Sequence, residues 1–204
     1  MVDRLTLNVR KPESNEYGEQ VLERMNRSHN ELALWALSKT DISNSKAILD
    51  IGCGGGKNIS NMLSLAPDAR VFGIDYSEAS VAKSVSLNSD AVASGRTEVR
   101  LGNASELPYV DGEFDFVTAF ETVYYWENIV DCFKGVRRIL AEGGRFLICN
   151  EDCDNKGIEE ASAALGMTLF TADELGDLLA RAGFSDIEVY AHENTRWVCA
   201  IGTK

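Results

Sequence analysis

The sequence predicts an α/β fold with three layers, in which helices cover both faces of a mostly parallel, seven-stranded sheet whose last strand runs antiparallel. Three observations predict this class. The 204 residues are 45% apolar and 25% charged, a composition typical of a globular protein. Short apolar segments alternate with helical patterns from residue 47 to residue 149. The last two strand segments are joined by Asn194 and Thr195 alone, which leaves no room for a crossover helix.

The first predicted element is a helix over residues 17–38. Its apolar residues recur at helical spacing: Val21, Leu22, Met25, Leu32, Ala33 and Ala36. Strand segments follow at residues 47–51, 70–74, 97–101, 114–120 and 145–149. Helical patterns come after the first, second and fourth of these strands, and Ser77 and Gly95 are suited to begin and end the second of those helices. This alternation indicates parallel strands joined by right-handed crossovers.

In the C-terminal part, strands and helices no longer alternate. Thr171 and Glu174 have the spacing of a capping box, which predicts a helix that runs to Gly183. Residues 187–193 and 196–204 then read as a hairpin, so the last strand is expected to be antiparallel. We expect one domain over residues 1–204. It would comprise a helical lid segment at 1–40, a cofactor-binding core at 46–150, and a helix with a β-hairpin at 151–204.

Composition excludes some classes of function. The formal net charge of -12 disfavours nucleic acid as a partner, since phosphate backbones attract basic surfaces. The longest apolar run, residues 32–37, is far too short for a membrane helix, and the N-terminus lacks the apolar stretch of a secretory signal. The five cysteines form no CxxC pair, and the Cys149–Cys153 spacing has no histidine cluster nearby, so we predict no metal site and a reducing, cytoplasmic location. We expect a monomer or a homodimer.

A glycine cluster after the first strand is the strongest local signal. Asp50 is followed by Gly52, Gly54 and Gly56 at alternate positions, and glycines here let the backbone turn and approach a ligand closely. Asp75 ends the second strand, where a carboxylate can accept hydrogen bonds from both ribose hydroxyls. The third small residue of the GxGxxG dinucleotide pattern would fall at Lys57, which disfavours a nicotinamide cofactor. Asp50 would repel a pyrophosphate but could hold an ammonium group, directly or through water.

With these motifs the sequence resembles the class I S-adenosylmethionine-dependent methyltransferases, and in particular small bacterial proteins with a generic methyltransferase domain. The resemblance is carried by ILDIGCGGGKN at 48–58, VFGIDYS at 71–77, GNASELPYVDGEFDFVTAFE at 102–121 and RILAEGGRFLI at 138–148. It implies a Rossmann-like sandwich, S-adenosyl-L-methionine as cofactor and S-adenosyl-L-homocysteine as product.

The resemblance also implies roles for individual residues. Gly52, Gly54 and Gly56 would line the methionine portion of the cofactor, with Cys53 packed beneath it. Asp75 would bind the ribose, and Tyr76 would lie against the adenine. Asn103 and Ala104 occupy the place where the family often has Asp-Ala, and the Asn103 amide oxygen can still accept a hydrogen bond from the adenine amine. Glu121 would flank the methionine end and the reacting methyl group.

Methyl transfer in this family is an in-line displacement at a sulfonium, so the protein mainly positions the reactants. A general base is needed only when the acceptor loses a proton, and the candidates are Glu121, Tyr124 and His29. One of the three aromatic residues 124–126 is expected to line a substrate pocket. The predicted function is methyl transfer to a small-molecule acceptor. The alternatives are a non-catalytic S-adenosylmethionine-binding protein or partner subunit, and a nicotinamide-dependent oxidoreductase.

Overall fold

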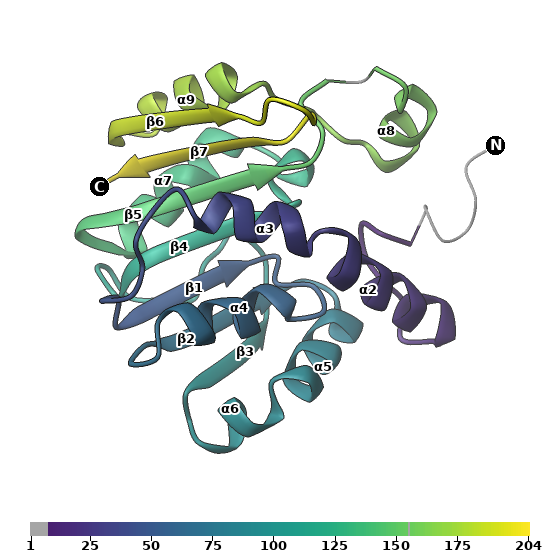
Figure 1. The fold of residues 1–204 in the computed structure, drawn as a ribbon, viewed down its shortest axis with the longest axis vertical. Helices are drawn as coiled ribbons and strands as arrows, with labels where there is room; N and C mark the ends of the chain where they lie inside the picture. Colours follow the sequence, from purple (N-terminus) through teal and green to yellow (C-terminus); the bar gives the residue numbers. More distant parts are fainter. Residues whose placement is uncertain (1–7, 155) are drawn as a thin grey trace.

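A computed structural model describes residues 8–154 and 156–204. Its centre is a seven-stranded sheet with the strand order β3-β2-β1-β4-β5-β7-β6 (Figure 1). The strands are β1 (Ala47–Ile51), β2 (Arg70–Asp75), β3 (Thr97–Leu101), β4 (Phe114–Phe120), β5 (Leu140–Asn150), β6 (Ser185–Ala191) and β7 (Val198–Thr203). The pairs among β1 to β5 are parallel, whereas β7 pairs antiparallel with both β5 and β6. The predicted sheet, including its antiparallel last strand, is confirmed.

Two apolar layers hold helices against the sheet. Residues of β1 alternate between them: Leu49 and Ile51 join the layer under α7 (Ile129–Ile139) and α9 (Ala172–Arg181), while Ile48 joins the layer under α3 (Asn30–Leu37) and α4 (Lys57–Leu65). Figure 1 shows α3 and α4 on the near face of the sheet and α7 and α9 behind it. Because successive side chains of a strand point to opposite faces, strands covered on both sides read as continuous apolar runs.

The N-terminal helical pattern forms two helices where the sequence predicted one. Helix α2 (Glu16–Ser28) ends and α3 begins at His29, whose backbone φ of -92° and ψ of 1° is not helical. The His29 N–H still donates to the Met25 carbonyl oxygen at 3.0 Å, so the chain changes direction without leaving that group unpaired. The break therefore places His29 at a corner.

The second predicted crossover helix is also divided, into α5 (Glu78–Leu87) and α6 (Ser89–Ala93). The Ser77 side chain caps α5, as predicted, by accepting from the Ser80 N–H. The buried residues of α5 are Ser80 and Ser84, so its apolar residues do not form the inward face. Small polar side chains there allow close packing against the chain that follows β1.

The remaining elements lie near the ends of the strands. A single 3₁₀ turn, η1 (Val123–Tyr125), follows β4, and the short helix α8 (Glu159–Leu165) lies in an acidic segment for which the sequence predicted no element. The capping box that begins α9 is present as predicted. Helices α2 and α8 lie beyond the carboxyl ends of the parallel strands (Figure 1). No helix in the described part of the chain is long and apolar enough to cross a membrane.

Candidate active site

Two neighbouring cavities lie at the carboxyl edge of the parallel strands, where ligands bind in sheets of this kind. The first cavity is lined by the loop after β1, the end of β4 and helix α2, and the second by the loops after β3 and β4. The second cavity has a volume of about 510 Å³, within the range of small-molecule sites. The residues that line both cavities join them into one site: Arg10, Gly52, Asp75, Tyr76, Thr122 and Tyr125.

The glycines after β1 serve different purposes. Gly52, Gly54 and Gly56 all have positive φ, a conformation that other residues rarely adopt. Gly52 and Gly54 line the first cavity, and a Cβ atom added to Gly54 would meet no atom within 4 Å. Gly56 lines neither cavity, and a Cβ there would lie 2.5 Å from Ser84 Oγ on α5. The structure thus leaves space for a ligand at Gly54 and uses Gly56 for helix packing. Cys53 is buried and borders the first cavity.

Asp75 joins the glycine loop to the end of β2. One of its carboxylate oxygens accepts from the Gly54 N–H and the other from the Ser77 N–H, each at 2.9 Å. The residue is 7% exposed, and burial raises the pKa of its carboxyl group although the two N–H donors oppose the shift. Each oxygen keeps a second lone pair, and Asp75 lines both cavities, so it can still accept hydrogen bonds from a ligand.

Asp50 lies beneath this loop and lines neither cavity. It is 1% exposed, and its carboxylate accepts from the Thr118 hydroxyl at 2.7 Å. Burial raises the pKa of Asp50 to about 7, against the opposing effect of the Thr118 hydrogen bond. A cationic ligand group above the loop would favour its charged form.

The residues predicted to contact adenine border the second cavity. Tyr76 lines both cavities, and its hydroxyl donates to the Arg10 carbonyl oxygen. Asn103 and Ala104 line the second cavity only. The Asn103 side-chain oxygen accepts from the Ser105 N–H at 3.1 Å, which directs this amide toward the local turn.

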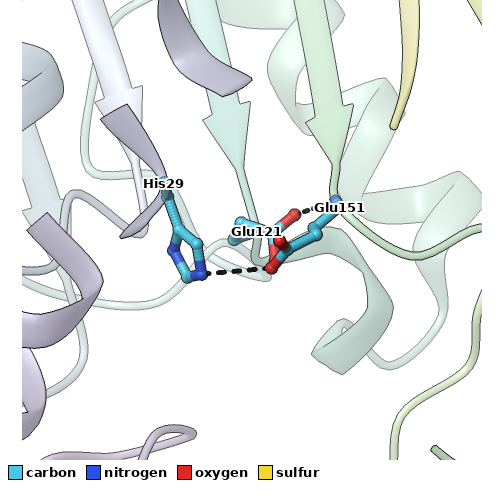
Figure 2. Close-up of side chains that lie close together, drawn as sticks. All are labelled: His29, Glu121 and Glu151. Carbon is cyan, nitrogen blue, oxygen red and sulfur yellow. Dashed lines mark hydrogen bonds and ion pairs between the residues drawn. The ribbon is translucent and has the colours of Figure 1, made fainter. Parts of the chain in front are cut away.

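Glu121, His29 and Glu151 form a polar cluster at the side of the first cavity (Figure 2). His29 comes from the corner between α2 and α3, Glu121 directly follows β4, and Glu151 directly follows β5. His29 Nε2 lies 3.5 Å from Glu151 Oε2, and the Glu151 N–H donates to Glu121 Oε1. Glu121 has a φ of 56°, an unusual conformation for a residue with a side chain.

The electrostatics of this cluster are coupled. Burial raises the pKa of Glu121 to about 7, although the charge of His29 and the Glu151 N–H oppose the shift. Burial lowers the pKa of His29, but the Glu151 hydrogen bond and the Glu121 charge outweigh it, and the net shift is upward. The hydrogen bond to His29 lowers the pKa of Glu151. The protonation state of each of the three groups therefore depends on the other two.

The three aromatic residues after β4 have different surroundings, because successive residues of a turn point in different directions. The Tyr124 hydroxyl donates to Glu121 Oε2 at 3.1 Å, and Tyr124 is buried outside both cavities. Tyr125 lines both cavities, and Trp126 lines the second while its ring packs edge-on against Phe133. The sequence predicted one cavity-lining residue among these three, so the prediction understated the aromatic lining.

Several residues that complete the site were not predicted from the sequence. The Asn26 side chain donates to the Gly55 carbonyl oxygen at 3.1 Å and so ties α2 to the glycine loop. Arg10 and Thr122 line both cavities, and Glu151 belongs to the polar cluster. Asn26 lies one helical turn before His29, which was one available signal. Glu151 lies two residues past the predicted strand at 145–149, which was a usable signal, whereas nothing in the sequence marks Arg10.

Comparisons with known proteins show the family of this chain. A family model described as "Methyltransferase domain" matches residues 42–183. The chain is similar to the O-methyltransferase resE of Aspergillus sclerotiorum, with 27% identity over 195 residues that cover 92% of this chain and 71% of that protein.

Solved structures share the fold. The complex of the Haloferax volcanii Trm112 methyltransferase activator with a methyltransferase matches with a TM-score of 0.81 and 18% identity, covering 100% of this chain and 98% of that chain. Phosphoethanolamine N-methyltransferase 2 of Haemonchus contortus, solved with S-adenosyl-L-methionine, has a TM-score of 0.81 and 15% identity, covering 100% of this chain and 60% of that chain. The matched family, the strand order and the glycine loop with Asp75 together show that the chain belongs to the class I S-adenosylmethionine-dependent methyltransferases.

Proposed function

We propose that this protein transfers the methyl group of S-adenosylmethionine to a hydroxyl group of a small molecule. The observation that carries the proposal is the continuity of the site: the glycine loop and Asp75 adjoin, in one cavity, the cluster of Glu121 and His29. A cofactor-binding loop thus lies beside groups that can accept a proton.

The residues present fit the cofactor. When bound, S-adenosylmethionine supplies an electrophilic methyl group on a sulfonium. Gly52, Cys53 and Gly54 would hold its methionine portion, and the open space at Gly54 supports this role. Asp75 would accept from the ribose hydroxyls, and Asp50 would place negative charge beneath the ammonium group. Gly56 would act indirectly, by packing the loop on α5.

The adenine portion would occupy the second cavity. Tyr76, Asn103 and Ala104 border that cavity together with Tyr125 and Trp126, which supports the predicted roles of the first three. Aromatic rings beside the site also favour a positively charged sulfonium.

Two observations favour a hydroxyl acceptor. A hydroxyl group loses its proton as it attacks, whereas a neutral amine attacks through a free lone pair, so a proton-accepting cluster is most useful to a hydroxyl. Glu121 and His29 are our candidates for this role. Tyr124, which the sequence also predicted as a candidate, is buried outside both cavities, so it would act only by donating a hydrogen bond to Glu121. The Aspergillus relative is named an O-methyltransferase, which supports the same acceptor class.

A small acceptor is favoured by the position of helix α2 beside the site. The first cavity lies under residues of α2, including Met25 and Asn26, which would act as its cover. The net charge of -12 gives no support to a nucleic-acid substrate. We keep the monomer or homodimer as a prediction that light scattering on the purified protein can check.

The test is turnover with methyl-labelled S-adenosylmethionine and matched panels of small phenols, alcohols and amines. We expect labelled methyl ethers together with stoichiometric S-adenosylhomocysteine. His29→Ala should lower kcat, whereas His192→Ala, which changes the other histidine of the chain, should not. Cofactor binding with no product above the acceptor-free background would favour the non-catalytic alternative. Label found only on amines would contradict the hydroxyl acceptor.

A further inference from the structure

The polar cluster at the first cavity has the residue types and the close spacing of a metal site. His29, Glu121 and Glu151 come from three separate segments of the sequence, and their side chains lie close together (Figure 2). These atoms all lie within 4.8 Å of one another, and His29 Nε2 is 3.5 Å from Glu151 Oε2. Ligand atoms about 2.0–2.2 Å from a shared ion lie roughly 3–3.5 Å apart, so side-chain movements of about 1 Å would complete the geometry.

The negative charge of the two carboxylates also favours a bound cation. Two carboxylates lie side by side at a partly buried position, and within the described residues neither has a lysine or arginine within ion-pair distance. His29 is their single close basic partner there, and it is one of the candidate ligands. Arg196 forms its ion pairs with Asp152 and Asp154, and at longer range its charge also lowers the pKa of Glu151. Carboxylates gathered without a matching cation are costly unless a proton or a metal ion neutralises them.

Neighbouring groups hold the central ligand in place. Glu121 Oε2 accepts from the Tyr124 hydroxyl at 3.1 Å, and Glu121 Oε1 accepts from the Glu151 N–H. Each oxygen retains a lone pair for coordination. Such supporting hydrogen bonds are typical of metal-binding carboxylates, since they fix the direction of the ligand atom.

We propose that His29, Glu121 and Glu151 bind one divalent cation of the Mn²⁺ or Zn²⁺ type. One imidazole nitrogen and two carboxylate oxygens suit this class of ion. Three protein ligands leave coordination positions open, and because His29 and Glu121 border the first cavity, a bound ion would be accessible from that cavity. The sequence predicted no metal site because its cysteines lack nearby histidines, whereas these three ligands are brought together only by the fold.

The ion's effect on catalysis rests on the proposed function. With the ion bound, Glu121 and His29 would act as ligands and no longer as proton acceptors. An acceptor hydroxyl that coordinates the ion loses its proton more readily, and that proton passes to solvent. The resulting oxygen anion forms a bond to the methyl carbon while the carbon–sulfur bond breaks and its electron pair stays on sulfur. The products are a methyl ether and S-adenosylhomocysteine.

The test measures metal binding directly, with Mn²⁺ as the probe. Mn²⁺ is chosen because the chain has five free cysteines, which would compete for Zn²⁺. The full chain, freed of metal with a chelator, is titrated with Mn²⁺ while electron paramagnetic resonance reports the free ion. We expect one Mn²⁺ per chain, and binding weaker by at least about tenfold in His29→Ala and in Glu151→Gln.

The controls are His192→Ala and Glu159→Gln, which change the other histidine and an exposed glutamate outside the cluster. Both should bind Mn²⁺ like the unmodified chain. The Glu151 side chain is 47% exposed, so Glu151→Gln should fold even where His29→Ala does not, and circular dichroism checks each variant. Binding of no Mn²⁺, or equal binding by both cluster variants and the controls, would overturn the proposal. A parallel titration with S-adenosylhomocysteine separates this failure from a failure of the proposed function.

Discussion

Gly54 and Gly56 show how the same residue type can serve binding at one position and folding at another. A side chain at Gly54 would project into open space, and one at Gly56 would collide with α5. Both have positive φ, which costs a residue with a side chain about 1–2 kcal/mol. The two positions therefore form a matched pair: a substitution has a similar backbone cost at each, and only the surroundings of the new side chain differ.

We expect Gly54→Ala to fold with a modest loss of stability but to bind S-adenosylhomocysteine weakly, because its methyl group occupies the ligand space. Gly56→Ala should lower the free energy of unfolding further, because Ser84 and Asn88 must move. Urea denaturation and calorimetric titration of both variants measure the two effects. Equal losses of stability would contradict the assignment of separate roles.

Asp75 carries a second residue-scale prediction. Asp75→Ala should weaken cofactor binding by about 2–4 kcal/mol if two charge-assisted hydrogen bonds to ribose are lost. It should also destabilise the loop, because the N–H groups of Gly54 and Ser77 lose their acceptor. Asp75→Asn keeps one acceptor oxygen and should lose less of both. Unchanged affinity in a folded Asp75→Ala protein would rule out the ribose role.

At the scale of elements, α2 contacts the glycine loop and borders the first cavity. Its Asn26 donates to Gly55, and its Glu19 and Glu23 pair with Lys83 of α5 at 3.4 and 2.9 Å. The ion pairs lie at the surface and contribute little stability, so α2 should open more easily than the sheet.

Hydrogen exchange should reveal this opening. We expect saturating S-adenosylhomocysteine to slow amide exchange in α2 and in the glycine loop, because the ligand fills the cavity that both of them line. Exchange in α9, which lies outside both cavities, should not change and serves as the internal control. Slower exchange in the loop without any change in α2 would show that α2 does not cover the site.

The elements that were predicted well are those with a strong local signal. The bounds of β1, β3 and β4 agree with their apolar segments, and the capping box of α9 is present. The breaks at His29 and Asn88 were missed because both lie within continuous helical patterns. Asn88 stops its helix through tertiary contact, since its side-chain amide donates to the Gly56 carbonyl oxygen at 3.0 Å. Contacts of this kind cannot be inferred from periodicity.

At the scale of the whole molecule, several acidic side chains with raised pKa values lie near one edge of the sheet. Burial raises the pKa of both Asp50 and Glu121 to about 7, and it also raises the pKa of Asp75. A folded-state pKa above the unfolded value means that the folded chain holds the proton more tightly. Such a group stabilises the fold at low pH, and that contribution is lost as the pH rises through the folded-state pKa.

Asp50 allows a test of this linkage. Its pKa is about 7 in the folded chain and near 3.8 without burial, so its contribution should fall by on the order of 2–3 kcal/mol between pH 5 and pH 8. Asp50→Asn carries no titrating group and should lose correspondingly less stability over the same range. Urea unfolding of both ligand-free proteins at the two pH values gives the difference. Parallel losses would show that Asp50 is ionised in the folded state at low pH.

The candidate site was predictable where it follows the strands and unpredictable where it depends on helices packed across them. Gly52, Asp75 and Asn103 lie at or just past the ends of successive strands, whose carboxyl ends share one edge. His29 reaches the cavity because the chain bends at that residue, between α2 and α3, and this position depends on the tertiary structure. Glu151 directly follows β5, so its place at this edge could be predicted, but its contact with His29 could not.

The measurement that tests the central claim most directly is calorimetric titration of the purified protein with S-adenosylhomocysteine, alongside NAD and NADP. The account predicts saturable binding of S-adenosylhomocysteine at one site per chain and none of either dinucleotide. Absence of S-adenosylhomocysteine binding by a folded protein would contradict the assignment of the glycine loop and Asp75 to this cofactor.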